Sequence, residues 1–268
     1  MKKYVSNNAR SLWVGEKQNL VRVNLLMLSL LMLCLNSCQK TWQVKEVKVD
    51  QYRMTNEMPS DSAINKIIEP YRKDLSKVMN VTIGESAVLL LKARPEGTLN
   101  NFVGDLLYER TTHYYGPIDF AIANYGGIRI PSIPPGPVAI GKVYELMPFD
   151  NQIVILKMKG ALLQQLLDRI AERRGWAVSK QLRFEIAADK ATAVTINGEP
   201  LDLLKEYLVS IPDYIANGGD SCDFLEAAER FDLNILVRDA MIEFVKKTEE
   251  EGQMLNAVLD GRIKYAEE

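Results

Sequence analysis

Three short stretches of this 268-residue chain carry side chains that could bind a ligand rich in oxygen atoms. In the first, a short apolar run ends in Asn124, two glycines and Arg129. The second is Pro-Phe-Asp-Asn at 148–151, and the third is Asp-Tyr-Ile-Ala-Asn-Gly-Gly-Asp at 213–220. Amides donate and accept hydrogen bonds, arginine presents a fork of donors suited to phosphate, and carboxylates suit ribose hydroxyls.

Aromatic residues in two of these stretches add a second kind of contact. Phe149 and Tyr214 could clamp a flat heterocycle between their rings. Either residue taken alone is more often a core aromatic, and a Gly-Gly turn after a strand is more often a plain tight turn. The combination of all three stretches, however, predicts a nucleoside or nucleotide site.

Composition limits the other chemistry that the chain could perform. The hydrophobic fraction of 47% and the charged fraction of 25% are typical of a globular protein. A formal charge of −2 gives no basic field, so we expect no nucleic-acid partner. The single histidine, His113, lies near the end of a predicted helix, and we expect it to face solvent rather than bind a metal. No Ser-His-Asp or Cys-His arrangement can be built around it.

The N-terminal segment is typical of a targeting sequence. Basic residues precede an apolar run over 25–35, which is too short for a comfortable membrane span. The run ends in Leu-Asn-Ser-Cys at 35–38, which resembles a bacterial lipobox. We therefore predict a lipoprotein signal peptide over 1–37 and lipidation of Cys38. An uncleaved anchor and an ordinary secretory signal are the alternatives.

Beyond the signal, we predict a tether over 38–59 and one domain over 60–268. No acidic run follows the predicted cleavage site, which favours a lipid-anchored protein on the periplasmic side of a bacterial envelope membrane. Cys222 would be the only free thiol of the mature chain, so no intrachain disulfide is expected. We expect this thiol to be a small buried residue rather than a nucleophile.

Hydrophobic periodicity predicts alternating helices and strands. A helix begins near residue 60, with Ser60 or Asp61 as its cap, and another covers 99–115, with Asn100 or Asn101 as its cap. The remaining elements are expected to be helices over 141–146, from 160 onward and over 234–247, and strands over 85–91, 118–123, 153–158, 182–186, 193–196 and 207–211.

Turn signals complete the expected fold. Asn197-Gly198 predicts a hairpin turn, and the proline-rich stretch 131–137 is expected to be a connector that can be neither helix nor central strand. Helices and strands alternate around this hairpin. The pattern predicts an α+β fold, in which a mixed β-sheet is packed with α-helices.

Together, the three stretches resemble the C-terminal domain of the bacterial and animal 5′-nucleotidase family. Residues 124–129 are similar to the family's Asn-Gly-Gly-Gly-Ile-Arg motif, and residues 148–151 to its Pro-Phe-Gly-Asn loop. Residues 213–224 are similar to its Asn-Phe-Leu-Ala-Asn-Gly-Gly-Asp-Gly-Phe segment. The resemblance covers roughly 88–247. It implies a 5′-nucleotidase C-terminal-like domain that binds the nucleoside part of a substrate.

The resemblance also implies roles for individual residues around the base. Phe149 and Tyr214 would sandwich the base. Asn124 would contact the base or hold the pocket, and Asn151 would contact the base.

Further roles concern the sugar and the phosphate. Arg129 would contact the phosphate, and Asp220 would accept hydrogen bonds from the ribose hydroxyls. A further family arginine precedes the helix that starts near residue 99, and Arg94 is the candidate for it.

The chain departs from the family pattern at several positions in these stretches. Tyr125 replaces the first glycine after the asparagine, and Asp150 replaces a glycine beside the base pocket. Tyr214 replaces a phenylalanine, and Ser-Cys-Asp at 221–223 replaces the glycine after Gly-Gly-Asp. Asp150 in particular could alter base preference or fill the pocket.

The family's other half, a two-metal phosphoesterase, has no counterpart in this sequence. Its Asp-X-His, Gly-Asn-His-Glu/Asp and Gly-His-X-His motifs are absent, and one histidine cannot supply two metals. About 50 residues separate Cys38 from the resemblance, which is too few for a catalytic domain. We therefore expect no cofactor in this chain, with divalent metals held by a separately encoded metallophosphatase partner.

Two functions remain open at this stage. The chain could be the nucleotide-binding half of a split 5′-nucleotidase, inactive alone in phosphomonoester hydrolysis and docked on the metallophosphatase. Alternatively, it could be a non-catalytic nucleoside-binding or interaction lipoprotein. In both cases, the expected partners are a nucleotide or nucleoside and, through the lipid anchor, a membrane.

Overall fold

The computed structural model describes residues 22–29, 44, 46–51, 55 and 61–267, and the chain divides into two units, 1–60 and 61–268. In the first unit, residues 22–29 are helical and exposed, and 46–51 form no regular structure. No helix in these described ranges is long and apolar enough to cross a membrane. Cys38, the predicted lipidation site, lies outside the described residues.

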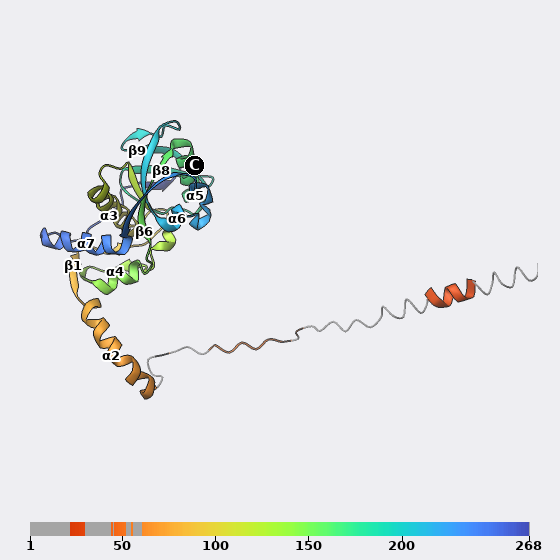
Figure 1. The fold of residues 1–268 in the computed structure, drawn as a ribbon. Helices are drawn as coiled ribbons and strands as arrows, with labels where there is room; N and C mark the ends of the chain where they lie inside the picture. Colours follow the sequence, from red (N-terminus) through yellow and green to blue (C-terminus); the bar gives the residue numbers. More distant parts are fainter. Residues whose placement is uncertain (1–21, 30–43, 45, 52–54, 56–60, 268) are drawn as a thin grey trace, which may run out of the picture. The chain divides into compact units, whose positions relative to one another are not determined.

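The second unit is built around a five-stranded sheet (Figure 1). Its spatial order is β12 (Glu229–Leu236), β6 (Gln152–Lys159), β11 (Glu206–Pro212), β3 (Phe120–Ala123) and β7 (Ala177–Val178). Strands β3 and β11 run parallel, and the other neighbouring pairs are antiparallel. The predicted mixed sheet is therefore confirmed.

The helices of this unit are α2 (Ser62–Met79), α3 (Thr98–Tyr115), α4 (Ile140–Leu146), α5 (Gly160–Glu172), the short α6 (Asp213–Ala216) and α7 (Val237–Glu250). Single-turn 3₁₀ helices are η1 (Tyr125–Gly127), η2 (Gly219–Ser221) and η3 (Asp223–Leu225). The predicted helices over 99–115, 141–146 and from 160 are confirmed within one residue of their starts.

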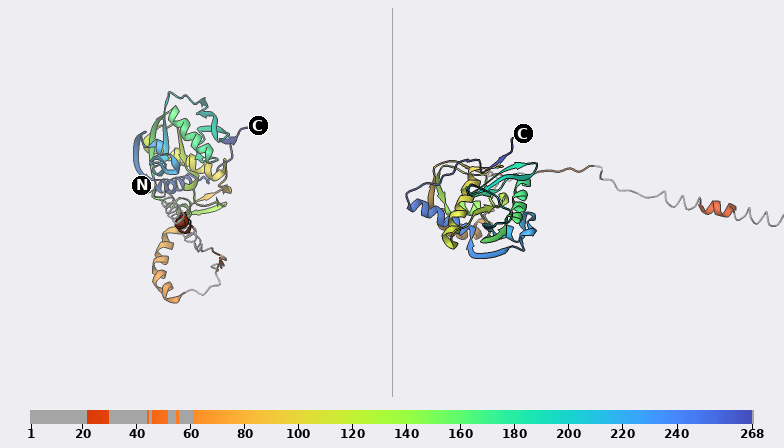
Figure 2. Two further views of the ribbon diagram at one scale, coloured as in Figure 1. Left: turned by 90° about the vertical axis from the view of Figure 1, so that its right-hand side faces the viewer. Right: turned by 90° about the horizontal axis from the view of Figure 1, so that it is seen from above.

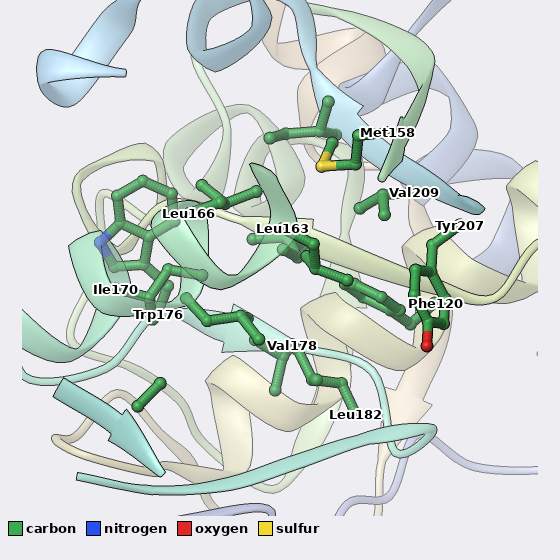
Figure 3. Packing of buried hydrophobic residues seen from close by; sticks show 14 of the residues in the cluster. Phe120, Met158, Leu163, Leu166, Ile170, Trp176, Val178, Leu182, Tyr207 and Val209 are labelled. Atoms are coloured by element: carbon green, nitrogen blue, oxygen red, sulfur yellow. The ribbon is translucent and has the colours of Figure 1, made fainter. Parts of the chain in front are cut away.

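Helices cover both faces of the central sheet (Figures 1 and 2). Side chains alternate between the two faces along each strand, and here both sets are apolar and need a covering layer. On β3, Phe120 and Ile122 pack into a core cluster with α5, which includes Leu163 and Leu166. Figure 3 shows this packing around Trp176. The intervening Ala121 and Ala123 join a second core cluster with α3 and α7.

Three smaller sheets complete the unit. A four-stranded sheet has the order β10 (Glu199–Pro200), β9 (Lys190–Ile196), β8 (Leu182–Ala187) and β13 (Ile263–Tyr265). The turn between β9 and β10 is the predicted hairpin, with Asn197 at φ 53° and Gly198 at φ 86°. The two-stranded sheets pair β1 (Thr82–Ser86) with β5 (Gly136–Ala139) and β2 (Leu90–Leu91) with β4 (Ser132–Ile133).

Several predicted boundaries were wrong. The single strand expected over 85–91 is two short strands, β1 and β2, and the connector expected over 131–137 contributes to β4 and β5. These strands lie only in two-stranded sheets, where a missing proline N–H costs no central ladder bond. The helix expected from residue 234 begins at Val237, because the preceding residues complete β12.

The predicted caps had different outcomes. Asp61 caps α2 as expected, because its Oδ1 accepts from the backbone N–H groups of Ala63 and Ile64 at 2.8 and 3.2 Å. The expected caps of α3, Asn100 and Asn101, are instead buried inside the helix. Both amides serve tertiary contacts: Asn101 Nδ2, for example, donates to the Val258 carbonyl at 2.8 Å.

Candidate functional site

The strand order brings the three motif loops to one edge of the central sheet. Residue 124 follows the end of β3 and residue 213 follows the end of β11, and these strands are parallel. Strand β6 is antiparallel to β11, with Ile153 opposite Pro212. The start of β6, and with it the loop at 148–151, therefore lies at that same edge.

A cavity of about 410 Å³ opens between these loops, within the size range of small-molecule sites. Its walls contain six of the seven predicted binding residues and two glycines: Asn124, Gly126, Gly127, Arg129, Phe149, Asn151, Tyr214 and Asp220. Arg94, the seventh predicted residue, is not part of the wall.

The two aromatic residues of the cavity are not core side chains. Phe149 is 41% exposed and Tyr214 is 46% exposed, so both side chains are accessible to a ligand in the cavity. The guanidinium of Arg129 lies 5.5 Å from the centre of the Phe149 ring. A Cβ added at Gly219 would lie 2.6 Å from the Tyr214 ring, so this glycine permits the position of the tyrosine.

A polar network joins the first and third loops through Asp220. One carboxylate oxygen accepts from Asn124 Nδ2 at 2.8 Å, and the other accepts from the Tyr214 hydroxyl at 3.4 Å. Asp220 has φ 54° and ψ 30°, in the left-handed region that non-glycine residues enter at a cost. The fold therefore holds this carboxylate at the cavity wall, with the side chains of both loops directed at it.

The sequence family follows from comparison with known proteins. A family model described as "5'-nucleotidase, C-terminal domain" matches residues 81–227, more than half of the chain. The chain belongs to this family. The resemblance drawn from the three motifs is thus confirmed.

The known proteins that the chain resembles are longer than the region they share with it. The chain is 27% identical over 189 residues to a 5'-nucleotidase of Vibrio parahaemolyticus, a match covering 66% of this chain and 33% of that protein. It is 26% identical over 148 residues to an NAD 5'-nucleotidase of Haemophilus influenzae, covering 48% and 24% respectively. The chain thus spans about a third or less of the length of these relatives.

Solved structures show the same fold. A 5'-nucleotidase precursor from Thermus thermophilus superposes with a TM-score of 0.68 at 29% identity, over 78% of this chain and 44% of that one. The NAD nucleotidase of Haemophilus influenzae superposes with a TM-score of 0.58 at 22% identity, over 78% and 42%. The second likeness is one of fold alone.

Asp150, one of the departures from the family motifs, does not fill the cavity. Arg238 Nη2 donates to Asp150 Oδ1 at 2.7 Å, and Arg238 Nη1 donates to the Phe149 carbonyl at 3.2 Å. The Arg238 side chain is 9% exposed and its guanidinium lies 4.4 Å from the centre of the Tyr144 ring. Burial opposes its charge, but the hydrogen bond to Asp150 raises the pKa of Arg238 above its ordinary value.

Sequence reasoning missed Arg238 because it missed strand β12. That strand is antiparallel to β6, with Leu236 opposite Gln152, and the Val237 N–H donates to the Asn151 carbonyl at 2.8 Å. Arg238, the second residue of α7, is thereby brought to the loop at 148–151. Had residues 229–236 been predicted as a strand, Arg238 would have been expected near the sheet edge that carries the three loops.

Tyr125, another departure from the family motifs, contacts two cationic side chains through its ring. Lys92 Nζ lies 3.9 Å and Arg94 Cζ lies 4.0 Å from the centre of its ring. Lys92 Nζ also donates to the Ile128 carbonyl at 2.7 Å, directly before Arg129. Burial, followed by the charges of Arg129 and Arg94, lowers the pKa of Lys92.

The other residue types considered for chemistry, namely metal ligands, His113 and Cys222, do not form a second site in the described residues. Among the residues that the structure describes, no three His, Cys, Asp or Glu side chains are grouped so that they could hold a metal ion. His113 is exposed near the end of α3, with its ring 5.3 Å from that of Tyr114. Cys222 is fully buried, and burial raises the pKa of its thiol to about 11, which fits the small buried residue predicted for it.

Proposed function

We propose that this chain is the nucleotide-binding half of a split 5′-nucleotidase, which acts with a separately encoded metallophosphatase subunit. The observation that carries the proposal is the cavity itself, in which two half-exposed aromatic rings face a carboxylate and a guanidinium. Membership of the 5′-nucleotidase C-terminal domain family supports the same conclusion. One histidine in 268 residues leaves the metals of the reaction to the partner.

In this proposal, each wall of the cavity binds one part of the nucleotide. Phe149 and Tyr214 stack on the base, and Asp220 accepts hydrogen bonds from the ribose hydroxyls. Arg129 neutralises part of the phosphate charge at the cavity mouth. The partner's metals supply an activated water, so the chain's own contribution is to hold the phosphate in position for attack.

Reconstitution tests the catalytic part of the proposal. Each protein is purified, and phosphate release from AMP is measured for each alone and for the equimolar mixture in Mn²⁺ or Mg²⁺. We expect the mixture to hydrolyse AMP at a rate that neither protein shows alone. The same mixture with Arg129→Ala should lose most of the gain, and an absence of gain with wild-type chains would overturn the split enzyme.

Calorimetry tests the binding part without the partner. We expect adenosine or another nucleoside to bind the isolated chain, and both Phe149→Ala and Tyr214→Ala to weaken the binding by about tenfold, because each removes one stacking face. Tyr71→Ala removes an aromatic that is 74% exposed outside the cavity and serves as the control. Unchanged affinity in both cavity variants would overturn the sandwich.

The alternative function is a non-catalytic nucleoside-binding or interaction lipoprotein. The departures from the family motifs at Asp150 and at 221–223 favour it. The Asp150 carboxylate points toward Arg238 and leaves the cavity open, so Asp150 no longer argues against nucleotide binding. Nucleoside binding without any gain of hydrolysis on mixing would favour this alternative.

A lipid anchor at Cys38 on the periplasmic side of a bacterial envelope membrane is part of the proposal. The lipobox-like 35–38 is its only support. We expect the chain to incorporate labelled palmitate and to fractionate with membranes, and Cys38→Ser to abolish both. Cys34→Ser is the matched control because Cys34 lies within the predicted signal, and membrane association unaffected by Cys38→Ser would overturn the anchor.

A further inference from the structure

Helix α2 has an apolar face that nothing in the described part of the chain covers. Apolar side chains recur every three or four residues along the helix, which places them on one side of it. They are between 40% and 74% exposed: Ile64, Ile67, Ile68, Tyr71, Leu75 and Val78. No residue of α2 is buried, whereas α3, α5 and α7 each contribute buried residues to the two core clusters.

Only the end of α2 is attached to the rest of the folded unit. Just beyond the helix, the Val81 carbonyl accepts from the Ile140 N–H at 2.9 Å. At the last turn, a Cβ added to Gly141 would lie 3.0 Å from the Met79 carbonyl, so these two backbones are in close contact. Figures 1 and 2 show the preceding turns projecting from the sheets and from the other helices. The apolar face is therefore open along most of its length.

The remaining positions of α2 are polar and more basic than acidic. Four basic and two acidic side chains lie along it: Lys66, Glu69, Arg72, Lys73, Asp74 and Lys77. Both carboxylates form ion pairs within the helix, at 3.3 and 2.8 Å. Lys66 and Lys73 have no acidic partner among the residues that the structure describes. An amphipathic helix of this charge, with an aromatic ring on its apolar face, is typical of helices that lie in a membrane interface.

A membrane surface fits this face better than a second copy of the chain. The 18 residues of α2 make about two and a half heptads, whereas a coiled coil needs three to four. Because Ile67 and Ile68 are adjacent, the face is also wider than the a/d seam of a coiled coil.

The membrane is also within reach. Residues 39–60 alone separate Cys38 from Asp61, the cap of α2, and a stretch of that length spans at most about 75 Å. With the proposed anchor, α2 therefore stays close to the bilayer.

Resting on the proposed lipid anchor for its location, we propose that α2 lies in the interface of the membrane as a second attachment of the chain. Its apolar face enters the boundary between headgroups and acyl chains. Lys66 and Lys73 then face anionic lipid headgroups. The first helix of the folded unit is thereby held at the bilayer surface.

Vesicle binding of the unlipidated chain tests this role apart from the anchor. Residues 39–268 contain both core clusters and lack Cys38, so no acyl chain takes part. They are sedimented with vesicles of phosphatidylethanolamine containing about 25% phosphatidylglycerol, and separately with phosphatidylcholine vesicles. We expect binding to both, about threefold to tenfold tighter to the anionic vesicles. Raising the salt concentration should narrow this ratio.

Substitutions on α2 locate the binding. Ile67→Ser combined with Tyr71→Ser should weaken it about tenfold or more, because two apolar side chains no longer enter the interface. Lys66→Gln combined with Lys73→Gln should remove the preference for phosphatidylglycerol. Leu204→Ser is the matched control, because Leu204 is 85% exposed in the loop before β11. Since no residue of α2 is buried, these variants should keep the folded unit intact.

A fluorescent label identifies the face that meets the lipid. Cys222 is fully buried and is the only cysteine of residues 39–268, so a cysteine introduced on α2 can be labelled alone. We expect an environment-sensitive dye on Leu75→Cys to shift its emission to the blue when vesicles are added. The same dye on Lys73→Cys, at the opposite side of the helix, should not shift.

The possible results separate the role of α2 from the anchor. If residues 39–268 bind neither vesicle, or if the α2 variants bind as the Leu204→Ser control does, the membrane role is overturned. A dimer in vesicle-free ultracentrifugation that Leu75→Ser dissociates, together with absent vesicle binding, assigns the face to a second copy instead. If the vesicles bind through α2 but Cys38→Ser leaves membrane fractionation unchanged, the anchor fails and the role of α2 stands.

Discussion

At the scale of single residues, two of the departures from the family motifs, Tyr125 and Asp150, each contact side chains elsewhere in the chain. Asp150 meets Arg238, and Tyr125 meets Lys92 and Arg94. In both pairs, a residue that replaces glycine is tied to a side chain far away in sequence. Asp150 therefore leaves the cavity open, and the ring of Tyr125 lies against two cationic side chains.

Arg238 is expected to matter for ligand binding although it is not part of the cavity wall. It holds the Phe149 carbonyl and Asp150, so replacing it with Met keeps most of its volume but releases the loop that carries one stacking ring. We expect the nucleoside Kd, measured by calorimetry, to rise about fivefold to tenfold, comparable to the loss of one charged hydrogen bond. Arg183→Met, at a side chain 45% exposed, should leave the Kd unchanged. Equal Kd values for both variants would contradict the role.

Cys222 is expected to be chemically silent in the folded chain. Burial raises the pKa of its thiol to about 11, so roughly one thousandth is thiolate at pH 8, and reactivity should increase as the pH approaches that value. Iodoacetamide labelling followed by peptide mass spectrometry should show this cysteine unmodified in buffer and fully modified in guanidinium chloride. Equal labelling rates in both conditions would show that the thiol is accessible.

At the scale of elements, the sequence was enough to find most helices and strands, because their apolar periods are strong. Helix α5 is an example: Leu163, Leu166 and Ile170 recur on one face and are fully buried. The loops that follow or precede strands were also identified, since glycine and proline mark them. What the sequence could not provide was the strand order, which places residue 149 beside residue 214.

Long-range pairing explains the main errors as well. Strand β12 is irregular at Asn234, where φ is 56°. Its last residues, 234–236, continue the apolar period of the helix that follows, so they were predicted as part of that helix. Asn100 and Asn101 have the residue type of helix caps, yet they are buried because other segments need their amides. An asparagine has the same local propensity whether it caps a helix or binds a remote segment, so only its tertiary partners distinguish the two roles.

Helix α2 shows that an apolar period does not by itself establish burial. Leu75, on its apolar face, is 58% exposed, and none of its residues is buried, whereas Leu166 of α5 is fully buried. We expect Leu75→Ala to change the free energy of unfolding in urea by less than about 0.5 kcal/mol, and Leu166→Ala to lower it by about 2–5 kcal/mol. A comparable loss in both variants would mean that the face of α2 is packed in solution.

At the scale of the whole folded unit, a buried arginine near the C-terminus joins remote segments. Arg262, whose side chain is 4% exposed, donates to Asp105 of α3 at 2.9 and 3.1 Å and to the Val178 carbonyl of β7 at 2.9 Å. It also donates to Asp260 at 2.9 and 3.0 Å. Arg262, directly before the last strand β13, thereby fixes that strand to α3, which lies near the start of the folded unit.

This cluster gives the stability of the unit a defined pH dependence. Burial alone would raise the pKa of Asp260, but the hydrogen bonds and charge of Arg262 hold it below its ordinary value. A carboxyl whose pKa is lower in the folded than in the unfolded state stabilises the fold above its unfolded pKa of about 3.9. That contribution is lost as the pH falls through the lower, folded value.

Replacing either arginine that contacts Asp260 separates the buried interaction from the exposed one. Arg262→Leu takes the main cationic partner away from the partly buried Asp105 and Asp260 and should lower the free energy of unfolding at pH 7 by about 3 kcal/mol. Arg183→Leu removes a partner 3.4 Å away whose side chain is 45% exposed, and should cost less than about 1 kcal/mol. Urea unfolding from pH 7 downward should show the Arg262→Leu deficit shrinking below pH 4, since protonated carboxyls no longer need the cation. A deficit that stays constant with pH would mean that the lost packing of Arg262, rather than its charge, holds the C-terminal strand.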